Sequence, residues 1–108
     1  MAVAFKALAT AGLGTAAALI YSPVGVGAQI DDARVTNTDA AALTVSIWRV
    51  SSGAAISNAN IVLLAESIAA GATARLNMSG LTLEAGQELW ALATTGGVAV
   101  LVLSGREH

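Results

Sequence analysis

The side chains that could perform chemistry are few in this chain, and they are scattered along it. There is a single histidine and no cysteine, and only 11% of the residues are charged. The histidine is His108, the last residue, where a neighbouring group cannot orient it as a catalytic triad requires. The absence of cysteine also excludes thiolate metal sites. We therefore predict no catalytic residue, no cofactor, no metal ligand and no enzymatic activity.

One group of oxygen-bearing side chains could in principle bind calcium. Carboxylate and amide oxygens are the ligands that calcium prefers. Their spacing matches no calcium-binding loop, and aspartate and asparagine are common in turns because their side chains hydrogen-bond to nearby backbone. We therefore interpret these residues as turn formers, and they are Asp31, Asp32, Asn37 and Asp39.

A second candidate is the pair of carboxylates Glu84 and Glu88, which flank a tight turn. Paired carboxylates can hydrolyse glycosides when they are held at a suitable separation. Nothing in the sequence assigns different roles to the two carboxylates, so we predict a solvated turn.

The two tryptophans, Trp48 and Trp90, are the remaining candidates for a binding surface. Trp48 is in phase with polar Thr44 and Ser46, so it belongs to the polar face of its strand. Exposed aromatic side chains stack on sugar rings, and they also anchor protein interfaces. We favour packing between subunits or sheets, and a glycan-stacking role remains as an alternative.

Composition narrows the class of protein. Apolar residues make up 56% of the 108 residues, with a formal net charge of −2. Soluble domains usually hold about 45–50% apolar residues, and nucleic-acid binders carry a basic patch. We therefore expect a single domain with apolar surface to bury, and no binding to nucleic acid or membrane.

The segment from Ala7 to Ile30 carries no charged residue and follows Lys6. Glycines, serine and Pro23 interrupt it, so it lacks the continuous apolar run of a transmembrane helix. Val26-Gly27-Ala28 is similar to the cleavage site of a signal peptide, which leaves that alternative open. We predict an extended structural arm over residues 1–14 and a sandwich domain over residues 15–108.

The elements that must position these residues are short strands separated by turn signals. Eight segments have strand patterns, with Ile30 out of phase with Ala33 and Val35, which predicts a β-bulge near Asp31-Asp32. We expect 88–94 and 98–104 to form a hairpin through Gly96-Gly97. Short strands at this spacing predict an all-β, single-domain sandwich or jelly roll. The segments are 2–10, 19–21, 28–37, 43–50, 61–68, 74–78, 88–94 and 98–104.

The last strand is apolar on both faces, since valine, alanine and leucine alternate from Val98 to Leu103. Such a strand, together with the N-terminal arm, favours contacts with other chains, because an extended segment can add to a neighbouring sheet edge. The predicted interface residues are Val3, Phe5, Leu8, Trp48, Trp90, Leu101 and Leu103.

Several runs carry a resemblance to a known family. They are LIYSPVG at 19–25, VTNT at 35–38, LTVSI at 43–47, IAAGAT at 68–73 and LTLEAGQEL at 81–89. With these runs the chain resembles small virion structural proteins of tailed bacteriophages, over nearly its whole length from about Phe5. It departs from them in its alanine content and in Asp31-Asp32, which replaces a mostly apolar stretch and leaves the point of attachment open.

The resemblance implies an all-β sandwich that is present in many copies on the virion. It would cement or decorate the capsid, or attach to the tail apparatus, after assembly in the host cytoplasm. The implied partners are copies of itself and the major capsid protein or tail proteins. Two alternatives remain open, which are a carbohydrate-binding sandwich that uses Trp48 and Trp90 for attachment and a secreted or surface adhesin-like module.

Overall fold

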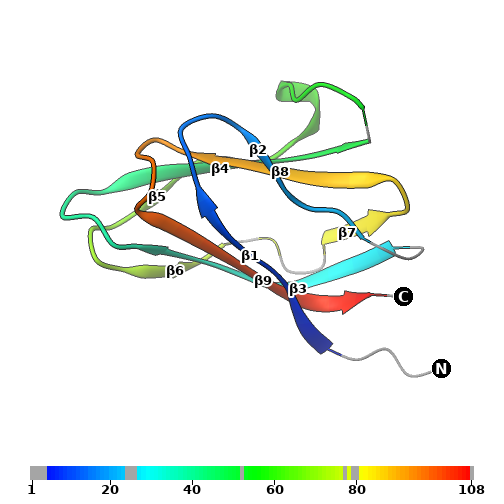
Figure 1. Ribbon diagram of the computed structural model, residues 1–108, viewed down its shortest axis with the longest axis horizontal. Coiled ribbons are helices and arrows are strands. Elements are labelled where there is room, and N and C mark those ends of the chain that lie inside the picture. Colours follow the sequence, from blue (N-terminus) through cyan, green and yellow to red (C-terminus); the bar gives the residue numbers. More distant parts are fainter. Residues whose placement is uncertain (1–4, 24–26, 52, 77, 79–80, 108) are drawn as a thin grey trace.

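The protein is a sandwich of two antiparallel sheets, seen in a computed structural model that describes residues 5–23, 27–51, 53–76, 78 and 81–107. One layer has the order β1-β9-β3-β6, with β7 also paired to β3, and is called the β9 sheet below. The other has the order β2-β8-β4-β5 and is called the β8 sheet. Figure 1 shows the two layers stacked. The strands are β1 (Phe5–Leu13), β2 (Ala18–Tyr21), β3 (Gly27–Asn37), β4 (Leu43–Ser51), β5 (Ile61–Ile68), β6 (Thr73–Arg75), β7 (Leu81–Glu84), β8 (Gln87–Ala93) and β9 (Ala99–Glu107), with a 3-10 turn, η1 (Asn58–Asn60).

The strand pairing is that of a jelly roll. β1 pairs with β9, β2 with β8, β3 with β6 and β7, and β4 with β5, so the chain is a set of nested antiparallel pairs. Within each sheet these pairs lie side by side, because β9 also pairs with β3 and β8 also pairs with β4. Two Greek keys folded this way define the jelly roll. The predicted all-β sandwich is therefore confirmed.

The core lies between the two sheets, because alternate residues of each strand point inward. In β9 the inward residues are buried and the intervening valines are exposed. Burial of these side chains away from water is the main stabilising contribution to such a fold. The largest fully buried apolar side chains of this core are Ile30, Val35, Val45, Ile47, Ile68, Leu83, Leu89, Leu101 and Leu103.

A buried asparagine closes one end of the core. The Asn37 amide donates to the carbonyls of Ala41 (2.9 Å), Ile68 (3.2 Å) and Ala69 (3.2 Å). Its Oδ1 accepts from the backbone N–H of Asp39 at 2.9 Å. Because buried polar groups are costly without partners, this set of bonds fixes the predicted turn after β3.

The predicted bulge is present. The pairing of β3 with β9 shifts between Ile30 and Asp32, which leaves Asp31 as the extra residue. Gly105 of β9 lies against the bulge, and a Cβ atom there would lie 2.0 Å from the carbonyl oxygen of Gln29. Only glycine allows the two backbones to approach this closely.

The predicted hairpin through Gly96-Gly97 is wrong. β8 and β9 belong to different sheets, so the connection crosses from one layer to the other. The backbone N–H groups of Ala93 and Thr94 donate to Gly14 and Thr44. A glycine pair marks a tight reversal of the chain, but the reversal here turns a corner of the sandwich.

The predicted arm over residues 1–14 also requires correction, except at residues 1–4, which lie outside the described residues. β1 pairs with β9 from Phe5 to Leu13, and Leu13 is buried in the core. This segment is therefore the first strand of the sandwich itself. The reason is that β9 offers it a free edge within the same chain, so it does not need a neighbour to satisfy its backbone.

Candidate functional site

The two tryptophans face each other on the outer surface of the β8 sheet. Trp48 of β4 and Trp90 of β8 are directly opposed in the register, and both are partly buried. The indole N–H of Trp90 donates to Oε1 of Glu88 at 3.0 Å. Opposed aromatic side chains on neighbouring strands stabilise a sheet by contact. The sequence singled out each tryptophan, but it did not predict that they form a pair.

Apolar residues extend this pair across the whole sheet. Leu19 of β2 is opposite Trp90, and Ile61 of β5 is opposite Trp48. Leu19 is 48% exposed, which is high for a large apolar side chain. A row of Leu19, Trp90, Trp48 and Ile61 therefore crosses all four strands of this sheet, and we call it the apolar row.

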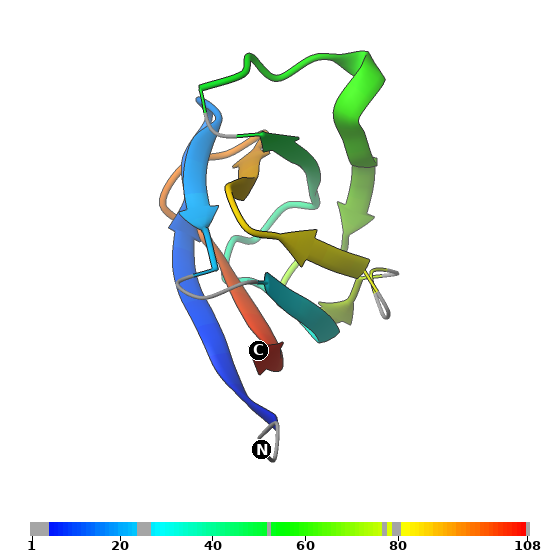
Figure 2. The ribbon, with the colours of Figure 1, turned by 90° about the vertical axis from the view of Figure 1, so that its right-hand side faces the viewer.

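A pocket lies beside the apolar row. It has a volume of about 270 Å³ and is lined by Ala17, Ala54, Ala55, Ile56 and Trp90. The β4–β5 connection supplies Ala54 to Ile56, and in Figure 2 this connection (green) arches over the sheet towards β5. The described lining residues carry no charge, so the pocket suits an apolar group.

Hydrogen bonds of a capping box hold the connection in place. Ser57 is the N-cap of η1, and its hydroxyl accepts from the N–H of Ala59 at 3.2 Å. Asn60 accepts from the N–H of Ser57 at 2.9 Å and donates to the carbonyl of Ala55 at 3.1 Å. This reciprocal arrangement satisfies free backbone groups at the turn. Ala55 and Ile56 therefore line a preformed pocket.

The predicted interface residues fall into four groups. Trp48 and Trp90 lie on the outer surface of the β8 sheet. Leu8 is partly buried against the core, while Phe5 pairs with Arg106 in the backbone register. Val3 lies outside the described residues.

Leu101 and Leu103 require correction, because both are buried in the core. The exposed large apolar residues of this strand are Val100 and Val102, each 37% exposed. The inward and outward side chains of β9 are both apolar here, so the sequence does not show which of them point into the core.

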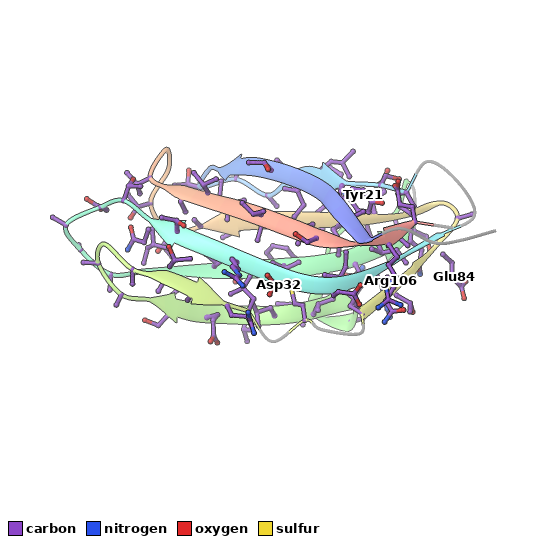
Figure 3. The ribbon with its side chains drawn as sticks, turned by 90° about the horizontal axis from the view of Figure 1, so that it is seen from below. Tyr21, Asp32, Glu84 and Arg106 are labelled. Carbon is purple, nitrogen blue, oxygen red and sulfur yellow. The ribbon has the colours of Figure 1, made fainter. Side chains whose placement is uncertain are left out.

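The oxygen-bearing residues considered for calcium each have their own partner. Oδ2 of Asp32 accepts from Nε of Arg34 at 2.8 Å, and its Oδ1 forms an ion pair with Nε of Arg75 at 3.0 Å. Oδ2 of Asp31 lies 3.1 Å from Nε of Arg106. Figure 3 shows Asp32 and Arg106 on the exposed face of the β9 sheet. These side chains form ion pairs on that face, and Asn37 and Asp39 form the turn described above.

The arginines on that face explain the position of Asp32. Arg34 and Arg75 are directly opposed in the pairing of β3 with β6, which places two like charges side by side. Like charges in this position repel each other. The carboxylate of Asp32 lies between them and bridges both, so this cluster stabilises the attachment of the short strand β6.

The two glutamates do not share a site. Glu84 ends β7, which belongs to the β9 sheet, whereas Glu88 is in β8 and accepts from Trp90. In Figure 3 Glu84 extends away from the body of the protein. They therefore do not form the paired carboxylates of a glycosidase.

Tyr21 links the two sheets, a contact that the sequence did not indicate. Its hydroxyl donates to Oε2 of Glu107, at the end of β9. Burial raises the pKa of Tyr21 well above its ordinary value, and the hydrogen bond and charge of Glu107 raise it further. The neutral phenol is therefore the form that the folded protein stabilises.

Comparison with protein-family models, with curated proteins and with solved structures found no match to this chain. Within the described part of the chain, no helix has the length and apolar character needed to cross a membrane.

Proposed function

We propose that this chain is a non-enzymatic structural component of a phage virion. It would assemble with copies of itself and would decorate or cement the capsid, or attach to the tail apparatus. The observation that carries the proposal is the apolar row across the β8 sheet, together with the pocket beside Trp90. Contiguous apolar surface on a soluble protein usually marks a contact with another protein.

The fold is compatible with this proposal. Jelly rolls occur in viral capsid proteins and also in lectins and cupins, so the fold alone does not imply one function. The side chains favour assembly. The pocket is lined by alanine, isoleucine and tryptophan, and the indole N–H of Trp90 is already donated to Glu88.

The experiment is the native mass of the full-length protein, measured by analytical ultracentrifugation from micromolar to millimolar concentration. We expect a species larger than the monomer. The full chain is required because removing residues 1–14 would delete β1 and the core residue Leu13. A monomer at every concentration would contradict self-assembly.

The virion location needs a separate measurement. An antibody raised against the purified protein would be applied to phage particles purified on a density gradient from the source culture. A virion component co-sediments with the particles in many copies and labels their surface. A protein that stays at the top of the gradient is not part of the particle.

A carbohydrate-binding module for surface or host attachment is the second candidate, and the opposed indoles of Trp48 and Trp90 favour it. Aromatic faces of this kind stack on sugar rings. Under this alternative, Trp48→Ala or Trp90→Ala abolishes binding to immobilised glycans and leaves the native mass unchanged. Under the assembly proposal, no glycan is bound by either variant or by the parent protein.

A further inference from the structure

The most exposed large apolar side chain of the described residues is Leu64, at 71% exposure. It lies in β5, which is an edge strand of the β8 sheet. Single exposed leucines are common on protein surfaces. Leu64 differs from such residues because the backbone around it is held in an unfavourable conformation.

A β-bulge presents Leu64 to the outside. Val45 pairs with Glu66 and Ile47 pairs with Leu63, so Leu64 and Ala65 together oppose the single residue Ser46. Ala65 has a φ angle of 49°, in the left-handed region, and is the one non-glycine residue of the described chain with a positive φ. This conformation costs a residue with a Cβ atom about 1–2 kcal/mol.

Ser46 maintains the bulge. Its hydroxyl accepts from the backbone N–H of Ala65 at 2.9 Å, and Ser46 itself is buried. Bulges often redirect a side chain at a functional surface. Strain that is retained by a specific hydrogen bond supports a role for the residue that it positions, which here is Leu64.

The pocket beside Trp90 matches the Leu64 side chain in size and in its apolar character. Its volume is about 270 Å³, below the roughly 300–1,000 Å³ typical of sites for drug-sized ligands. This volume accommodates one branched aliphatic side chain with its neighbours better than a whole cofactor. The lining is apolar, and the capping box at Ser57 holds its loop in place.

We propose that Leu64 of one copy inserts into the pocket beside Trp90 of a second copy. The proposal rests on the self-assembly proposed above and names the contact that produces it. An uncharged side chain and an uncharged pocket of the same chain fit each other, so repetition of one contact can build the assembly. Burial of Leu64 removes apolar surface from water, which is favourable.

The two features lie near opposite edges of the β8 sheet. Leu64 is on β5, at one edge, whereas the pocket includes Ala17, next to β2 at the other edge. A contact that joins opposite edges of successive copies is head-to-tail and produces a closed ring or an open filament, whereas a two-fold dimer forms the Leu64 contact twice. The native mass of the parent protein distinguishes a dimer from a larger assembly.

The test uses two variants that each destroy one half of the contact. Leu64→Asp removes the inserted side chain and leaves the pocket intact, and Ala55→Glu places a charge in the pocket and leaves Leu64 intact. Both positions are exposed, so neither change alters the core. Val100→Asp is the matched control, because it changes an exposed valine of the β9 sheet. Leu64→Ala provides a milder second variant.

Ultracentrifugation of each variant and of an equimolar mixture gives the result. We expect Leu64→Asp and Ala55→Glu to be monomers separately, and the mixture to contain a dimer and nothing larger. This pattern follows because each variant retains the half that the other has lost. Leu64→Ala should weaken assembly by at least about tenfold, equivalent to ~1.4 kcal/mol. Val100→Asp should assemble like the parent protein.

The results that would refute the Leu64 contact differ from those that would refute the proposed self-assembly. If the parent protein assembles and Leu64→Asp assembles equally well, the Leu64 contact is refuted while self-assembly stands. If both variants are folded monomers by circular dichroism but the mixture gives no dimer, the pairing of Leu64 with the pocket is also refuted. A parent protein that is monomeric at millimolar concentration contradicts both proposals.

Discussion

Replacing Gly105 by alanine should destabilise the protein strongly, because this glycine lies where β9 passes the bulge of β3. The added Cβ atom would lie 2.0 Å from the carbonyl oxygen of Gln29, 3.0 Å from its carbonyl carbon and 3.1 Å from the backbone nitrogen of Asp31. Carbon and oxygen atoms in contact normally lie about 3.3–3.6 Å apart. The two strands must therefore separate by more than about 1 Å.

The magnitude follows from two costs. Overpacking in a well-packed interior typically costs about 1–3 kcal/mol, and each ladder hydrogen bond stretched by the separation costs about 0.5–1.5 kcal/mol. We expect a loss of about 3 kcal/mol in the free energy of unfolding. At ~4–8 °C per kcal/mol for a domain of this size, the melting temperature should fall by roughly 12–24 °C.

The assay is urea unfolding of Gly105→Ala, with thermal unfolding as a second measurement. Gly12→Ala is the matched control, since Gly12 is in a strand of the same sheet and a Cβ atom there meets nothing within 4 Å. It should be as stable as the parent protein, or more stable by about 0.5 kcal/mol. The reasoning is refuted if Gly105→Ala stays within about 0.5 kcal/mol of the parent, or if both variants fall equally.

Three further predictions test the other contacts. Burial and Glu107 raise the pKa of Tyr21. The neutral phenol therefore stabilises the folded protein fully below the ordinary tyrosine pKa of about 10, and this stabilisation declines as the pH rises above that value. Between pH 9 and pH 11 the parent should therefore lose ~1 kcal/mol more stability than Tyr21→Phe in urea unfolding; equal losses would contradict this. Ala65→Gly should raise the free energy of unfolding by about 1 kcal/mol, because glycine adopts a positive φ without strain; a less stable variant in the same assay would count against strain at Ala65. Asp32→Asn should cost ~0.5–1 kcal/mol at low salt, and the difference should shrink in 1 M NaCl, where the Debye length is about 3 Å; a difference independent of salt would mean that the opposed charges of Arg34 and Arg75 are not its cause.

The strands could be predicted from the sequence because alternation of polar and apolar residues is local. The expected segments at 28–37, 43–50 and 61–68 coincide with β3, β4 and β5 to within a residue. The bulge at Asp31 was also predictable, since an extra residue shifts the phase of the alternation. The pairing of strands was not, because partners such as β1 and β9 are far apart in the chain.

The candidate site shows the same division. Each tryptophan was identified from its strand, yet the opposition of Trp48 and Trp90 depends on the register between β4 and β8. The pocket depends on alanines of the β4–β5 connection, which carry no signal of their own. In the sequence, Leu64 is one apolar residue of an apolar strand, and only the bulge at Ala65 distinguishes it.

The two outer faces of the sandwich differ in the charged groups that a bound partner would remove from water. On the β9 sheet, Val100 and Val102 lie near the ion pairs that Asp31 and Asp32 form with arginines. Covering this face would remove those charges from water, and the cost of desolvation can exceed the attraction between them. The four members of the apolar row and the residues lining the pocket are uncharged, and the carboxylate of Glu88 beside them already accepts from the indole N–H of Trp90. The same apolar area therefore gives a more favourable contact on the β8 sheet, which is why we place the assembly contact there although both faces expose large apolar side chains.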